Sequence, residues 1–197
     1  MPLTAIGLNG SGSAPQAMTP DIFENLGLRE IPRYGWLPVT VPGAVGAWAA
    51  SSKRFGSLPL DEVLKPAMEY AYEGYPVQPF IAQQWQRTAC RYMDREDFRD
   101  TFLPGGRAPR AGEIFRCPEL GDSLQKIGQS CGETFYRGDL ARAIVEYSER
   151  TGGLLRYDDL ANYEAEWVEP ICTVYRGYTV WQIPPVFGSI EIPTMAT

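Results

Sequence analysis

Histidine is absent from the 197 residues of this chain. Its absence excludes Ser-His and Cys-His nucleophile pairs, a histidine general base and every metal site that needs a histidine ligand. The four cysteines form no C-x-x-C pair, which argues against a zinc ribbon or a thioredoxin-like redox motif. We therefore expect buried thiols, and we predict no metal site and no cofactor.

Long apolar runs and an excess of positive charge are also missing. No apolar run approaches the ~18 residues of a membrane span, and residues 1–6 are too short and too poor in basic residues for a signal peptide. The net charge of −6 argues against nucleic-acid binding, because that affinity depends on Lys and Arg. We predict no nucleic-acid or membrane partner, and the compartment stays open between the cytoplasm and the periplasm or exterior.

The chain does contain enough apolar residues for a core, and many residues that form turns. Hydrophobic residues make up 44% of it and charged residues 21%, which is typical of an ordinary folded domain. Its 20 glycines and 17 prolines predict short helices separated by loops. These features together favour a helix-rich α+β domain.

Apolar periodicity predicts most of the chain to be helical. In residues 60–73, apolar side chains recur at spacings of three and four and define one buried face, which Pro66 interrupts with a kink or a boundary between two abutting helices. The helix that starts at Pro79 should bury Phe80, Ile81 and Trp85. Further helices are expected at residues 22–26, 44–55, 140–151 and 157–163, and from residue 118 onward.

Strand signals are confined to two segments. Residues 171–182 alternate in character about Arg176-Gly177, which is typical of a β-hairpin. Residues 37–41 also predict a strand. The mixed charges and glycines of residues 93–116 predict a solvated loop.

Composition and spacing alone identify no active site. The glycine-rich residues 7–12 lack the G-x-G-x-x-G order and are not followed by G-K-[ST], so we interpret them as a turn rather than a phosphate cradle. The pair Asp158-Asp159 lies at a predicted helix start, where interaction with the helix dipole and exposure at the surface explain it.

A series of short motifs resembles the gamma-glutamyltranspeptidase family. The first, Val39-Thr40-Val41-Pro42-Gly43, is similar to the strand-to-helix turn of that family. The others follow in the family's order and at similar spacing, so that the resemblance covers residues 1–185. They are Arg54-Phe55-Gly56, Pro66-Ala67-Met68, Gly74-Tyr75-Pro76-Val77, Phe135-Tyr136-Arg137-Gly138, Gly152-Gly153, Asp159-Leu160-Ala161-Asn162-Tyr163, Tyr175-Arg176-Gly177-Tyr178 and Pro184-Pro185.

The resemblance implies a fragment of the large subunit of an N-terminal-nucleophile hydrolase with αββα architecture. Such a proenzyme cuts itself into two subunits, and the new N-terminal threonine of the small subunit is the nucleophile, with its own α-amine as general base. The implied reaction cleaves γ-glutamyl or related amides, such as glutathione, through an acyl-enzyme that water or an amine resolves. The implied partner is the small subunit that carries this threonine.

Two departures from the family pattern bear on function. The family nucleophile lies in a Thr-[Thr/Ser]-His context, so a chain without histidine contains no catalytic residue, and the fragment alone is predicted to be inactive. The family also places an arginine that binds the donor's α-carboxylate just before an Ala-Pro. Here Ala14-Pro15 is preceded by Ser11-Gly12-Ser13. Ser11 and Ser13 are therefore the candidate substrate-binding residues.

Residues 1–197 are accordingly expected to form a single partial domain. Residues 186–197 are an atypical tail, because Pro193 would interrupt the long helix that the family has there. The alternative interpretation is a non-catalytic helical binding or scaffold module. A downstream Thr-[Thr/Ser]-His segment in the same reading frame would favour the enzyme.

Overall fold

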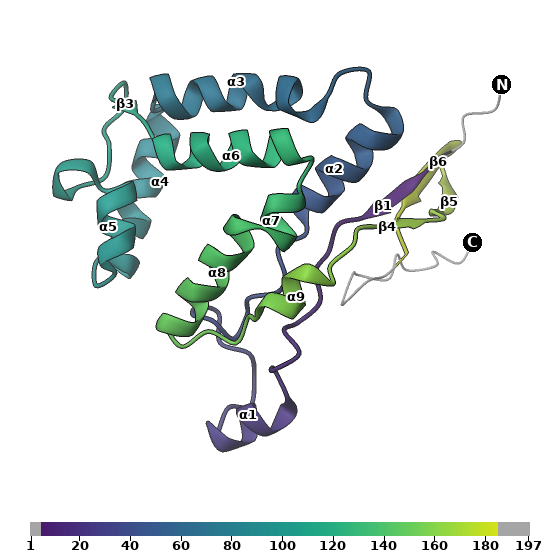
Figure 1. The fold of residues 1–197 in the computed structure, drawn as a ribbon, viewed down its shortest axis with the longest axis horizontal. Coiled ribbons are helices and arrows are strands. Elements are labelled where there is room, and N and C mark those ends of the chain that lie inside the picture. The colour runs from purple at the N-terminus through teal and green to yellow at the C-terminus, as the bar shows by residue number, and fades with distance from the viewer. Residues whose placement is uncertain (1–4, 185–197) are drawn as a thin grey trace. The chain divides into compact units, whose positions relative to one another are not determined.

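The computed structural model describes residues 5–184, which belong to two compact units. Unit 1 combines the chain up to Leu60 with the chain from Ser130 onward, and unit 2 comprises residues 61–129. Both units combine helices with two-stranded antiparallel sheets (Figure 1). This composition confirms the predicted helix-rich α+β class.

Unit 1 contains five helices among its described residues, four of which lie within a few residues of the predicted positions, whereas the short helix at Glu133–Arg137 was not predicted. Its core includes Val41, Val45 and the side chains of Ala141, Leu155 and Leu160, each less than a tenth exposed. The helices are α1 (Pro20–Asn25), α2 (Ala44–Phe55), α7 (Glu133–Arg137), α8 (Asp139–Arg150) and α9 (Tyr157–Ala161).

The strands of unit 1 form two separate antiparallel pairs. Strand β1 (Gly7–Asn9) pairs with β4 (Glu166–Val168), and β5 (Ile171–Tyr175) pairs with β6 (Tyr178–Gln182) (Figure 1). Arg176 and Gly177 join β5 to β6 with φ angles of 49° and 83°. Two successive left-handed residues suit the right-handed twist of a two-residue hairpin. The predicted hairpin is confirmed.

Unit 2 is built around two neighbouring antiparallel helices, α3 (Leu60–Glu73) and α6 (Pro118–Ser130) (Figure 1). A Cβ atom on Gly121 would lie 2.6 Å from the Tyr72 ring, so glycine permits the close approach. Helix α3 runs through Pro66 without a break, which rules out the two abutting helices considered above. The other elements are β2 (Tyr75–Pro76), α4 (Pro79–Ala89), η1 (Cys90–Tyr92), α5 (Glu96–Phe102), η2 (Pro104–Gly106) and β3 (Ile114–Phe115).

An aromatic cluster and an ion pair organise the connection before α6. Val77 and Phe115 are buried, and the Trp85 ring lies edge-on to Phe115 with centroids 4.8 Å apart. Arg107 donates two 2.8 Å hydrogen bonds to Glu113. Together with the Arg110 amide, this guanidinium lowers the pKa of Glu113 to about 2.

Three predictions about secondary structure and burial are wrong. Residues 37–41 form no strand, because Val41 makes a single backbone bond to Ser13 and the described chain offers no neighbouring strand there. Residues 93–116 are not one loop, since they contain α5, η2 and β3. Phe80 and Ile81 are 66% and 40% exposed, and α4 buries Ala82 and Ala89 instead.

The cysteines are more exposed than predicted. All four cysteines are free thiols, but Cys90, Cys131 and Cys172 are exposed rather than buried.

The predicted tail at residues 186–197 lies outside the described residues. No helix between residues 5 and 184 combines the length and the apolar character of a membrane span.

Candidate functional site

The two candidate serines lie on a well-anchored stretch of irregular chain, residues 9–16, which we call the 9–16 segment. The buried Asn9 accepts the Ser11 amide through its Oδ1 atom at 2.9 Å. The Ser13 carbonyl accepts the Val41 amide at 2.9 Å. Residues 7–9 belong to strand β1 and residues 10–12 are irregular chain, so the prediction of a turn over residues 7–12 is wrong.

A buried carboxylate anchors the end of the 9–16 segment. Asp159 is 7% exposed, and its two oxygens accept the amides of Gln16 and Arg156, each at 2.8 Å. Asp159 lies in the first turn of α9, which confirms the predicted helix start, but it is buried and not at the surface, so that part of the prediction is wrong. Its partner Gln16 is 143 residues away in the chain, so no local pattern could reveal the contact.

Glycines allow the 9–16 segment to lie against the turn that starts α2. A Cβ atom on Gly43 would be 2.0 Å from the Gly10 carbonyl oxygen, and one on Gly12 would be 1.7 Å from the Val41 carbonyl oxygen. Since real Cβ atoms do not approach other atoms so closely, side chains at these positions would push the two segments apart. The motif Pro42-Gly43 therefore serves this contact.

Two tyrosines hold the same turn from the other side. The Tyr136 hydroxyl accepts the Gly46 amide at 2.9 Å and donates to the Pro42 carbonyl at 2.8 Å. The Tyr163 hydroxyl donates to the Gly43 carbonyl at 3.2 Å. Burial raises the pKa of Tyr136 to about 12, so its hydroxyl stays protonated at physiological pH. In the sequence, these tyrosines stand out only as members of family motifs.

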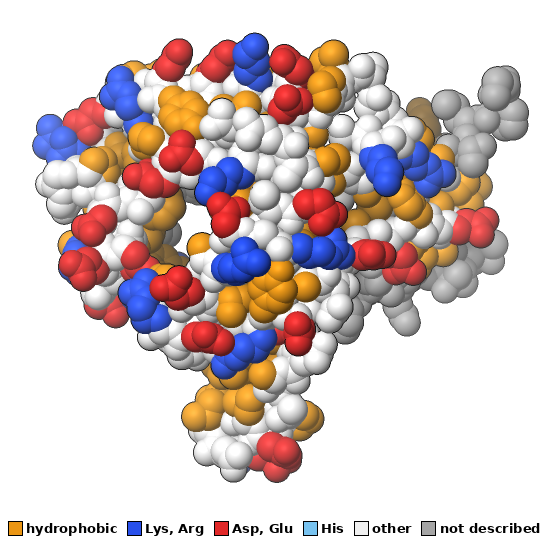
Figure 2. Space-filling model, viewed as in Figure 1, with side chains coloured by type: hydrophobic (Ala, Val, Ile, Leu, Met, Phe, Trp, Pro, Cys, Tyr) orange, Lys and Arg blue, Asp and Glu red, His pale blue; other side chains and the backbone are white. Residues whose placement is uncertain are grey.

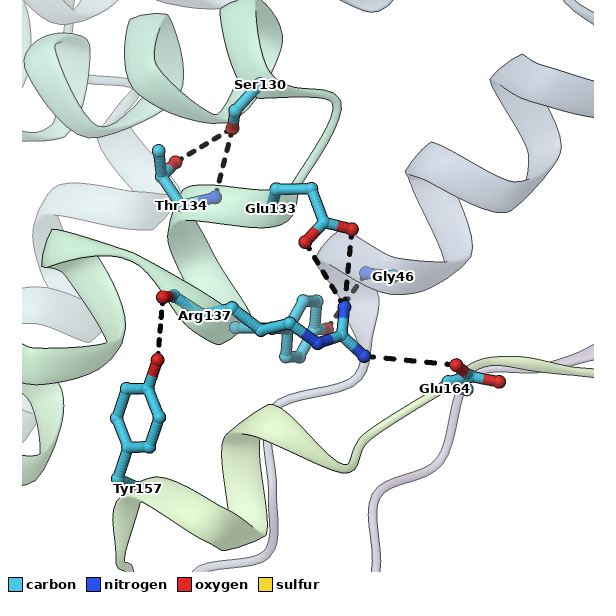
Figure 3. Close-up of polar contacts among 8 residues, drawn as sticks. Gly46, Ser130, Glu133, Thr134, Arg137, Tyr157 and Glu164 are labelled. Carbon is cyan, nitrogen blue, oxygen red and sulfur yellow. Dashed lines mark hydrogen bonds and ion pairs between the residues drawn. The ribbon is translucent and has the colours of Figure 1, made fainter.

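Around α7, charged side chains form an exposed network beside the tyrosines. Arg137 lies between Glu133, at 3.3 Å, and Glu164, at 3.9 Å (Figure 3). The Tyr157 hydroxyl donates to the Arg137 carbonyl at 2.7 Å. Exposed ion pairs of this kind contribute little to stability, so we treat the network as surface structure.

The structure leaves Ser11 and Ser13 accessible. Both residues are exposed, and their anchoring bonds use backbone atoms. Within residues 5–184, no hydrogen bond or ion pair joins either serine side chain to an arginine. The segment therefore offers hydroxyl groups and a fixed backbone, but not a guanidinium group, to a ligand.

Residues 4–195 match the sequence profile of the family described as gamma-glutamyltranspeptidase. The chain belongs to this family. Among curated proteins, it is 37% identical to a glutathione hydrolase-like proenzyme of Bacillus subtilis, over 90% of this chain and 34% of that protein. It is 33% identical to an acylase proenzyme of a Pseudomonas species, over 92% of this chain and 34% of that protein. The chain thus spans about a third of the length of these relatives.

The fold of this gamma-glutamyltranspeptidase-family chain is similar to solved structures of both acylases and transpeptidases. The cephalosporin acylase of Bacillus halodurans superposes with a TM-score of 0.88 at 49% identity, covering 91% of this chain and 35% of that one. The gamma-glutamyltranspeptidase of Helicobacter pylori gives a TM-score of 0.85 at 26% identity, covering 91% and 53% of the two chains. The family resemblance and the fold predicted from the motifs are both confirmed.

Proposed function

We propose that this chain is part of the large subunit of an amidase that cleaves γ-glutamyl or related amides through a threonine acyl-enzyme. The observation that carries the proposal is the family match over residues 4–195. Two of the relatives are named as proenzymes, a glutathione hydrolase-like one and an acylase, and a third is named a cephalosporin acylase. Their similarity argues against the alternative of a non-catalytic helical binding or scaffold module.

In the proposed reaction, the hydroxyl of the small subunit's N-terminal threonine attacks the amide carbonyl and loses its proton to its own α-amine. An ester forms between the threonine and the acyl group, the C–N bond breaks, and the departing amine takes up the proton. Water or an acceptor amine then attacks the ester, which releases the acyl group and regenerates the threonine. Backbone amides stabilise the oxyanion.

The part that we assign to this chain is substrate binding by Ser11 and Ser13. Their exposed hydroxyls lie on the anchored 9–16 segment, whose conformation is fixed before a substrate arrives. An arginine binds a carboxylate through two charge-assisted hydrogen bonds, whereas a serine offers one neutral bond. We therefore propose a donor related to γ-glutamyl amides whose binding does not depend on an arginine at these two positions.

The proposed function is tested in the whole proenzyme that contains this chain. We expect it to cleave itself into two subunits and then to release p-nitroaniline from an acyl anilide. The control is a proenzyme whose nucleophilic threonine is replaced by alanine, which should do neither. A wild-type proenzyme that stays uncleaved and inactive on γ-glutamyl, 4-aminobutyryl and glutaryl anilides would contradict the proposal.

We further propose that the rest of the proenzyme, including the small subunit, covers the β5–β6 hairpin. Six large apolar side chains of the hairpin are exposed in this chain, and they lie on both faces of the ribbon. Figure 2 shows apolar side chains gathered where Figure 1 places the hairpin. They are Ile171, Val174, Tyr175, Tyr178, Val180 and Trp181.

We expect the isolated chain to bind a hydrophobic dye and to self-associate, because so many large apolar side chains exposed on one short hairpin are unusual on a monomer. Replacing Val174 and Tyr178 by threonine should lower both signals, measured by dye fluorescence and sedimentation velocity. The matched control is Phe80→Ser, which removes one equally exposed apolar side chain from α4 in unit 2. A monodisperse wild-type chain that binds no dye would contradict the prediction.

A further inference from the structure

Helix α2 begins without a capping side chain. Its N-cap residue is Gly43, which has no side-chain oxygen for the free amides of the first turn. Ser, Thr, Asp or Asn would ordinarily supply one. A Cβ atom at Gly43, however, would lie 2.0 Å from the Gly10 oxygen and 2.3 Å from the Tyr163 hydroxyl. The close approach of the 9–16 segment therefore excludes a conventional cap.

The Tyr136 hydroxyl supplies the missing cap from α7. Gly46 is the third residue of α2, and its amide is one of the groups that an N-cap side chain normally binds. Tyr136 accepts this amide and donates to the Pro42 carbonyl, so that one hydroxyl joins the two sides of the turn. The residue is 4% exposed, and without its hydroxyl both backbone groups would lose their partner in a water-poor environment.

Tyr163 completes the arrangement on the same turn. Its ring stacks on Tyr136 with centroids 5.0 Å apart and an angle of 21° between the planes. Its hydroxyl donates to the Gly43 carbonyl. A Cβ atom on Gly46 would lie 2.7 Å from the Tyr163 ring, so glycine is required there for the ring to approach the helix.

We propose that Tyr136 and Tyr163 are positioning residues for the substrate-binding segment. They fix the turn from Pro42 to Gly46, against which the backbone of Gly10 lies. Through the bond between the Val41 amide and the Ser13 carbonyl, the same turn fixes the two serines. The tyrosines act through the backbone and touch no substrate. The inference relies on the proposed function only in treating the 9–16 segment as a substrate-binding element.

Hydrogen–deuterium exchange of the whole proenzyme tests the positioning directly. In Tyr136→Phe, the amides of Val41 and Gly46 should exchange about tenfold faster than in the wild type, because the turn loses both hydroxyl bonds. Tyr163→Phe should give a smaller increase at Val41. The matched control is Tyr157→Phe, which removes a hydroxyl bond to the Arg137 carbonyl outside the turn and should leave both amides unchanged (Figure 3).

Kinetics on an acyl anilide test whether this positioning serves the substrate. Tyr136→Phe should raise KM about fivefold with kcat within twofold, since the segment binds the donor equally in the ground and transition states. Self-cleavage to the normal extent shows that the Tyr136→Phe proenzyme is folded. If this variant does not fold, the same kinetics are measured on Tyr163→Phe.

Unchanged exchange at Val41 in a folded Tyr136→Phe proenzyme would overturn the proposal. An unchanged KM in Tyr136→Phe would also overturn it. So would a fall in kcat that occurs equally in Tyr136→Phe and in the control Tyr157→Phe. A wild-type proenzyme with no amidase activity would instead refute the proposed function, and the exchange experiment would still decide what the tyrosines do.

Discussion

We expect the purified 197-residue chain to release no measurable amine from a γ-glutamyl anilide. Any residual rate should lie at least about 10⁴-fold below that of the whole proenzyme. The proposed reaction begins when a threonine hydroxyl, activated by its own α-amine, attacks the amide. In the family this threonine precedes a histidine, and this chain contains no histidine. Serine and cysteine side chains of the chain also lack a histidine to activate them.

The measurement is the release of p-nitroaniline as a function of chain concentration, with a mock preparation from host cells as control. Turnover that scales with the chain and is absent from the mock preparation would contradict the prediction. A second control adds the separately produced remainder of the proenzyme. If the two parts assemble, the activity should appear only in the mixture, because the proposed reaction needs both the threonine and the 9–16 segment.

The parts of the fold that the sequence predicts are those stabilised by local interactions. Residues 44–55, which are mostly small or apolar, form a helix that ends at Gly56, where the backbone becomes extended. The β5–β6 hairpin forms because Arg176-Gly177 can adopt the left-handed turn that its strands need. Both signals lie within about a dozen residues, so they can be recognised without knowledge of tertiary contacts.

The failures occur where tertiary packing decides. Residues 37–41 have the composition of a strand, yet no neighbouring strand pairs with them in the described chain. Residues 93–116 contain α5, whose Phe102 ring packs against Trp85 and Phe115, with centroids 6.3 and 6.4 Å away, despite the surrounding charges. Phe80 is exposed because α4 places the smaller Ala82 against Phe115 and Val77. In each case, long-range contacts outweigh local propensity.

In the candidate site, too, short motifs can be recognised from the sequence, whereas long-range contacts cannot. Ser11 and Ser13 are proposed by comparing a short motif with the family, which requires no structure, and their role in binding stays a prediction. Asp159, Tyr136 and Tyr163 are missed as anchors because they bond to residues between 90 and 143 positions away. The only sequence signals for them are the family motifs in which they occur, and those motifs say nothing of which backbone groups the side chains bind.

Restoring an arginine on the 9–16 segment should restore preference for donors with an α-carboxylate. A charge-assisted hydrogen bond contributes roughly 1.5–3 kcal/mol, whereas a neutral serine bond contributes about 1 kcal/mol. The difference of roughly 0.5–2 kcal/mol for one bond corresponds to about 2- to 30-fold in affinity. In the whole proenzyme, Ser13→Arg, or failing that Ser11→Arg, should therefore raise kcat/KM for γ-glutamyl anilide about tenfold.

Both positions can accept the larger side chain. Ser11 and Ser13 are exposed, and the bonds that anchor the segment come from backbone atoms that the substitutions keep. Gly12 between them must stay glycine, because a Cβ there would lie 1.7 Å from the Val41 oxygen. The substitutions should thus change the chemistry of the site without moving the segment.

Two matched controls separate carboxylate recognition from other effects of added charge. The first is 4-aminobutyryl anilide, which is the γ-glutamyl donor without its α-carboxylate, and its kcat/KM should change less than twofold. The second is Ser57→Arg, which adds the same side chain at an exposed position outside the 9–16 segment and should leave both donors unaffected. If the wild-type proenzyme already hydrolyses glutathione as efficiently as other family members do, the carboxylate is bound by another group, such as Arg29 or Arg33, and the argument from the two serines is wrong.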